Sequence, residues 1–97
     1  MAEVIFQDRR ETGEVIIEAV VYRVEESGEY PEGIRYSFQA HRDGETVIRY
    51  DNYNRHAGSR HHKHIGESKV EKLEDQPENK QEILELYKKF IEEVKEQ

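Results

Sequence analysis

The chain has no cysteine, which excludes disulfide bonds and thiolate metal sites. It also lacks a long apolar run, since none approaches the roughly 20 residues that a membrane-spanning helix needs. The amino-terminal segment MAEVIFQDRRE contains no apolar stretch of the length found in signal peptides. We therefore expect a cytoplasmic protein without a membrane partner, for which a reducing compartment is suitable.

Apolar residues are scarce throughout the 97 residues. Only 34% are hydrophobic, whereas 38% are charged and the formal net charge is -7. This composition predicts one small domain, residues 1–97, with a thin core made by a single sheet covered on one face. A domain of this size buries a modest share of its surface, so we also consider a homodimer or an obligate partner. The net acidity argues against general nucleic-acid binding.

The apolar residues alternate with polar ones over several segments, which is typical of strands with one buried face. In residues 33–42, Ile34, Tyr36, Phe38 and Ala40 point one way and the intervening polar side chains point the other. Asp43-Gly44 then predicts a tight hairpin, because both residues tolerate a positive φ. The expected strands are residues 4–6, 14–24, 33–42, 46–52, 61–65 and 69–73.

The carboxyl-terminal segment predicts an amphipathic helix, with Asn79 as its N-cap and Glu82 in the capping-box position. The fold class is therefore α+β: an antiparallel meander of five or six strands with this helix packed on one face. Apolar helix residues recur at spacings of three and four: Ile83, Leu84, Tyr87, Phe90, Ile91 and Val94. The large aromatic residues expected in the core are Tyr22, Tyr36, Phe38, Tyr50, Tyr87 and Phe90.

Residues 49–66 carry a net positive charge, although the chain as a whole is acidic. They hold four basic residues against one acidic residue, and they contain four of the five histidines: His56, His61, His62 and His64. Histidine is the side chain whose ordinary pKa lies nearest neutral pH. A cluster of histidines with guanidinium and ammonium groups suits phosphate chemistry near neutral pH.

One interpretation of this segment is metal-free cleavage of RNA. A base removes the proton of the 2′-hydroxyl, an acid protonates the leaving 5′-oxygen, and a cation stabilises the phosphorane. Strand alternation places His62 and His64 on one face about 7 Å apart, which can bracket one phosphate. The other groups considered are Arg49, Lys63 and Arg60 as phosphate clamps, Asp51 as a partner of an imidazole, and Tyr50 or Tyr53 as a stacking platform.

Three other interpretations stay open. His62, His64, His56 and Asp51 could ligate a metal, but no HExxH or CxxC pattern is present and nearby Arg60 and Lys63 would repel a cation. We therefore rank a metal site lower and expect no metal and no cofactor. The run could also be a solvated polar edge without chemistry. Alternatively, the chain could be a non-catalytic module that docks a protein partner at a sheet edge.

The run from Ile48 to Asn52, which contains YDN, and the run His61-His62-Lys63-His64 resemble motifs of the TumE-like toxin family of prokaryotic toxin–antitoxin modules. The resemblance extends over roughly residues 14–95. It implies a toxin that acts on RNA and a helix-turn-helix DNA-binding antitoxin as its partner. Residues 53–60 differ from the proline-rich loop of many members, so substrate specificity is not transferred. The residues of this chain that match the family motifs are Arg49, Tyr50, Asp51, Asn52, His61, His62, Lys63 and His64.

These arguments define the candidate site. The candidate catalytic residues are His61, His62, His64, Arg49 and Asp51. The candidate substrate-binding residues are Tyr50, Asn52, Arg55, Arg60 and Lys63.

Overall fold

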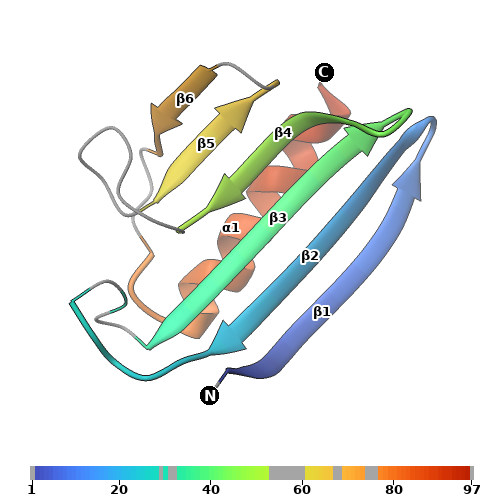
Figure 1. Cartoon of the computed structure of the whole chain (residues 1–97). Coiled ribbons are helices and arrows are strands. Elements are labelled where there is room, and N and C mark those ends of the chain that lie inside the picture. Colours follow the sequence, from blue (N-terminus) through green and yellow to red (C-terminus); the bar gives the residue numbers. More distant parts are fainter. Residues whose placement is uncertain are drawn as a thin grey trace.

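Each strand of the protein pairs antiparallel with the next one along the chain, which gives one open six-stranded sheet in the order β1-β2-β3-β4-β5-β6. A single helix crosses one face of this sheet (Figure 1). The computed structural model describes residues 2–28, 30, 33–52, 61–66, 69–73 and 77–96. The predicted α+β meander with a carboxyl-terminal helix is confirmed. The elements are β1 (Glu3–Thr12), β2 (Val15–Arg23), β3 (Ile34–Arg42), β4 (Glu45–Asp51), β5 (His62–Ile65), β6 (Lys69–Lys72) and α1 (Lys80–Lys95).

The hydrophobic core lies between the sheet and α1. Alternate residues of β2 and β3 are buried on this side, as the period of two predicts. On the helix, Leu86 is buried and the expected Leu84 is only half-buried, because Leu84 lies further around the helix from the centre of the apolar stripe. The buried helix residues are Ile83, Leu86, Tyr87, Phe90, Ile91 and Val94.

Strand β1 is much longer than the predicted residues 4–6. It continues through polar residues because an edge strand pairs on one side only and accepts charged side chains. Asp8 accepts a hydrogen bond from the Tyr87 hydroxyl at 2.7 Å and one from the Arg10 guanidinium, also at 2.7 Å. The bond from Tyr87 ties the edge strand to the helix, whereas the bond from Arg10 lies within the strand.

No helix of the described residues lies on the opposite face of the sheet, and we call it the open face. One residue on it corrects the sequence prediction. Tyr22 is half-buried and alternates with the core residues Val21 and Ala19, so it lies on the open face and not in the core. The Thr46 hydroxyl accepts a hydrogen bond from the open-face residue Gln39, because a bulge after Ala40 shifts the register of β3 and β4.

The start of α1 is capped as predicted. The Asn79 side chain accepts a hydrogen bond from the Glu82 backbone N–H at 2.9 Å. The Glu82 carboxylate reaches back to the backbone N–H of Glu78, one residue before the usual capping-box partner. None of the helices in the described part of the chain is long and apolar enough to cross a membrane.

Candidate functional site on the open face

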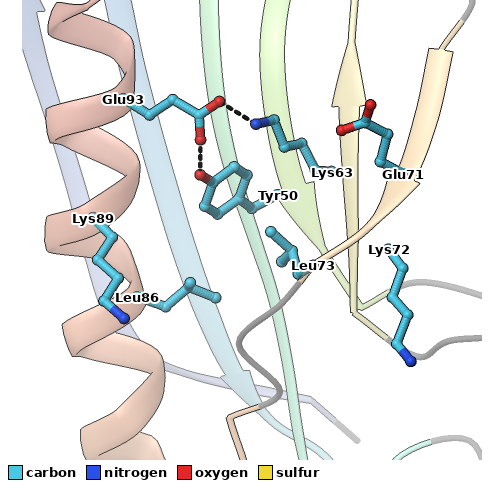
Figure 2. A pocket seen from close by; sticks show the side chains of 8 residues that line it. All are labelled: Tyr50, Lys63, Glu71, Lys72, Leu73, Leu86, Lys89 and Glu93. Atoms are coloured by element: carbon cyan, nitrogen blue, oxygen red, sulfur yellow. Dashed lines mark hydrogen bonds and ion pairs between the residues drawn. The ribbon is translucent and has the colours of Figure 1, made fainter.

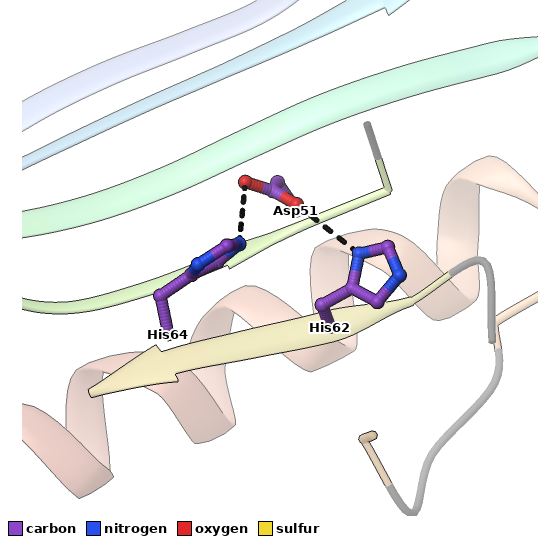
Figure 3. A group of neighbouring side chains, drawn as sticks. All are labelled: Asp51, His62 and His64. Carbon is purple, nitrogen blue, oxygen red and sulfur yellow. Dashed lines mark ion pairs between the residues drawn. The ribbon is translucent and has the colours of Figure 1, made fainter. Parts of the chain in front are cut away.

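Strands β4 and β5 bring four polar side chains together. Their register places Arg49 opposite His64 and Asp51 opposite His62. Because alternate residues of a strand share a face, all four side chains lie on the open face, away from α1. Figure 3 shows the carboxylate of Asp51 directed toward both imidazoles. We call Arg49, Asp51, His62 and His64 the histidine cluster.

The Asp51 carboxylate is the centre of the histidine cluster. Its Oδ2 lies 2.8 Å from Arg49 Nε and 3.4 Å from His64 Nε2. Its Oδ1 lies 3.5 Å from His62 Nδ1. The two imidazole rings have centroids 6.3 Å apart and are inclined at 72°. Two titratable rings and one guanidinium therefore surround a single carboxylate.

The cluster has a buried floor and an accessible rim. The side chains of Asp51 and His62 are 1% and 0% exposed, whereas those of His64 and Arg49 are 17% and 36% exposed. A ligand that approaches the open face thus meets His64 and Arg49 first. Asp51 and His62 lie beneath them.

His64 has the properties of a neutral base. Its pKa is lowered from 6.5, mainly by burial, which disfavours the charged ring. The Asp51 carboxylate acts in the opposite direction, and the nearby charge of Arg49 adds to the lowering. At neutral pH the ring is therefore predominantly uncharged and has a lone pair to accept a proton.

The same geometry bears on the metal interpretation. Asp51, His62 and His64 each offer one ligand atom, and these atoms lie within 4.8 Å of one another. However, the Arg49 guanidinium already pairs with the Asp51 carboxylate and lies 3.4 Å from His64 Nε2. A cation placed there would meet this positive charge at short range. The positive charge of Arg49 therefore disfavours a metal ion at this position. The other proposed ligand, His56, lies outside the described residues.

Comparison with known proteins places this site in a family context. The family model for toxin TumE matches residues 2–97. The chain belongs to the TumE toxin family. A toxin family suggests an antitoxin partner in general. No curated protein and no solved structure matches the chain significantly.

Several residues of the TumE motifs lie on the helix side of the sheet instead of in the histidine cluster. His61 is fully buried, with its Nδ1 2.9 Å from the Tyr36 hydroxyl and its ring stacked on Tyr36. Tyr50 is buried against Phe90. The structure therefore separates His61 and Tyr50 from the open face.

Glu93 of α1 joins two further motif residues on the helix side. It accepts a hydrogen bond from the Tyr50 hydroxyl and forms an ion pair with Lys63 (Figure 2). These residues line a cavity of about 410 Å³ between α1 and strands β4 to β6. The apolar pattern of the helix does not include Glu93. Its position beside the apolar stripe, three residues after Phe90, is the signal that could have marked it as half-buried.

The YDN asparagine extends the pairing of β4 with β3 by one step. Asn52 is buried, and its side-chain oxygen accepts a hydrogen bond from the Tyr36 N–H at 2.9 Å. Its amide nitrogen donates to the Ile34 carbonyl at 2.8 Å. These contacts fix the end of β4, where Asp51 must be held. The remaining predicted substrate-binding residues, Arg55 and Arg60, and also Tyr53, lie outside the described residues.

Proposed function

We propose that this TumE-family toxin is a metal-independent ribonuclease that uses the histidine cluster. The observation that supports it best is the convergence of two imidazoles and a guanidinium on the buried Asp51 carboxylate. Titratable rings next to a fixed cation are the groups that RNA cleavage by its own 2′-hydroxyl requires.

The proposed reaction is an internal transfer at one phosphodiester. The imidazole of His64 takes the proton of the 2′-hydroxyl, and the 2′-oxygen attacks the phosphorus. The bond from phosphorus to the 5′-oxygen breaks, and that oxygen receives a proton from His62. The products are a 2′,3′-cyclic phosphate and a 5′-hydroxyl. Arg49 stabilises the negative charge that develops on the non-bridging oxygens.

Position and exposure support these assignments. His64 is accessible and has a lowered pKa, which suits a base at neutral pH. Arg49 is the most exposed member of the cluster, and its guanidinium is held by Asp51. His62 is buried beside Asp51, so its role as an acid requires the ring to become accessible when RNA binds.

The proposal leaves Lys63 and His61 out of the reaction. Lys63 pairs with Glu93, and His61 lies against Tyr36, both on the helix side of the sheet. A phosphate on the open face would be separated from them by the sheet itself. Arg49 is therefore the cation that stabilises the negative charge on the phosphate.

The test uses a labelled oligoribonucleotide in the presence of a chelator. We expect cleavage that leaves 2′,3′-cyclic phosphate ends, and no cleavage when every 2′-hydroxyl is replaced by 2′-O-methyl. His64→Ala should lower the rate by about 10² to 10⁴-fold. His41→Ala is the matched control, because His41 is an open-face histidine that pairs with Glu18 instead of Asp51.

Two results would contradict the proposal. Full activity of the His64→Ala variant would show that His64 is not the base. Activity that disappears with the chelator and returns with Zn²⁺ would instead support the metal interpretation of Asp51, His62 and His64.

We also propose, from the resemblance of the YDN and HHKH motifs, that the antitoxin is a helix-turn-helix DNA-binding protein. The gene beside this one should encode it, and co-expression should yield a stable complex and suppress RNA cleavage. An isolated gene, or a neighbour that forms no complex, would contradict this pairing.

A further inference from the structure

Tyr22 differs from the other large aromatic residues of the sheet in its surroundings. Phe6, Tyr36, Phe38, Tyr50, Tyr87 and Phe90 all make ring contacts on the helix side. Tyr22 lies half-buried on the open face, and among the described residues it has neither a ring contact nor a hydrogen-bond partner. Its ring is thus available to a molecule that lies on this face.

A shallow hollow of about 260 Å³ adjoins the Tyr22 ring. Open-face side chains from β1, β2 and β3 line it, including Gln7, Val20, Ser37 and Gln39. These four side chains are uncharged. Of the charged lining residues on this face, Arg9 is basic and Glu18 is acidic, and the Glu18 carboxylate lies 2.8 Å from His41 Nε2. The hollow therefore combines one flat ring with neutral polar groups.

The hollow is continuous with the histidine cluster through the register of β3 and β4. Ser37 lies directly opposite Asp51, and Gln39 lies directly opposite Arg49. From Asp51, Tyr22 is two strands across the sheet and two residues along it. With ordinary sheet spacings this corresponds to about 12 Å between backbone positions. A group bound at Tyr22 would thus be a neighbour of the group bound at the cluster.

This combination fits an unpaired nucleobase. Bases of single-stranded RNA stack on aromatic side chains, and their edges form hydrogen bonds with neutral polar groups. Ser37 and Gln39 supply a hydroxyl and an amide at the side of the hollow nearest the cluster. Arg35 lies directly opposite Tyr22 on β3.

We propose that the hollow is a nucleobase subsite for single-stranded RNA. Tyr22 stacks on the base of a nucleotide near the phosphodiester held by the histidine cluster, and not on the nucleotides that flank the cleaved bond. This inference rests on the proposed function, because it takes the histidine cluster as the cleavage site. It explains how a chain of net charge -7 could hold RNA: stacking supplements the few cationic contacts.

The test compares substrates of two lengths. With an oligoribonucleotide, Tyr22→Ala should raise KM by roughly 5- to 100-fold, the range expected for loss of one stacked base, and Tyr22→Phe should leave it nearly unchanged. With a dinucleotide, which cannot reach the hollow, Tyr22→Ala should leave KM and kcat unchanged. Ile16→Ala is the matched control, since Ile16 is half-buried on the open face of β2 outside the hollow.

A binding measurement separates this inference from the proposed function. A 2′-O-methyl oligonucleotide with a photoreactive uridine should bind the wild-type protein and crosslink to Tyr22 or its neighbours. Unchanged KM of Tyr22→Ala on the oligoribonucleotide would overturn the subsite and leave the ribonuclease intact. Binding that depends on Tyr22 without any RNA cleavage would support the subsite and overturn the ribonuclease. Absence of binding, or crosslinks on the helix side only, would overturn the subsite.

Discussion

Arg49 Nε lies 2.8 Å from Oδ2 of Asp51, and this contact joins an accessible guanidinium to a buried carboxylate. A carboxylate removed from water is costly unless it is paired and hydrogen-bonded. Arg49 therefore has two roles that must be separated by experiment. It stabilises the fold around Asp51, and in the proposed reaction it binds the phosphate.

We expect Arg49→Met to lower the free energy of unfolding by about 1–3 kcal/mol, because it leaves Asp51 buried beside two imidazoles without its closest cation. The double variant Arg49→Met/Asp51→Asn should cost less than the sum of the two single changes. Urea denaturation measures all three. Arg9→Met is the control, since Arg9 pairs with Glu11 on the exposed surface and should change stability by less than about 1 kcal/mol. Additive effects of the two cluster substitutions would show that the ion pair does not couple them.

The proposed roles of His62 as the acid and His64 as the base can be tested with a modified leaving group. We expect His62→Ala to recover most of its activity on RNA in which sulfur replaces the leaving 5′-oxygen, because a thiolate departs without being protonated. His64→Ala should not recover, since the 2′-hydroxyl still needs a base. Single-turnover rates on oxygen and sulfur substrates provide the comparison. If the sulfur substrate rescued both variants, or neither, His62 would not be the acid.

The lowered pKa of His64 predicts how cleavage depends on pH. Burial lowers its pKa below 6.5, so the neutral ring required of a base persists to mildly acidic pH. We expect the acidic limb of the kcat/KM profile to rise with pH through a midpoint below 6.5. Arg49→Gln should move that midpoint to higher pH, because it removes a positive charge that lowers the pKa and frees Asp51 to raise it. Titration of the His64 ring by NMR gives the same midpoint independently.

The lowered pKa of His64 also determines the direction in which folding stability changes with pH. The pKa of His64 is lower in the folded protein than the ordinary 6.5 of an unfolded chain. The unfolded state therefore binds the proton more readily, and folding becomes less stable as the pH falls from above 6.5 toward the folded pKa. His64→Gln should flatten this part of the stability profile. An unchanged slope would mean that another group produces it.

The sequence was sufficient to predict that Asp51 is the partner of an imidazole, and the structure brings it close to both His62 and His64. Alternation places Arg49 and Asp51 on one face of β4 and His62 and His64 on one face of β5, and only eight residues separate the YDN run from the HHKH run. The position of Tyr22 was predicted wrongly because all large aromatic residues were assigned to the core, although alternation with Val21 indicates the other face. The length of β1 was missed because Asp8 and Arg10 look like a loop until Tyr87, far along the chain, provides their partner. Long-range contacts of this kind leave no local signal.

Asn52 offers the clearest test of a motif residue with a structural role. Its amide forms two buried hydrogen bonds with the backbone of β3, and removing them leaves the Tyr36 N–H and the Ile34 carbonyl without that partner. We expect Asn52→Ala to lower the free energy of unfolding by about 2 kcal/mol. At a temperature where the variant is folded, its KM for RNA should equal that of the wild-type protein. Asn52→Asp serves as a matched variant, because it keeps the acceptor for Tyr36 and loses the donor to Ile34. A folded Asn52→Ala with a strongly raised KM would instead assign Asn52 to substrate binding, as the sequence first suggested.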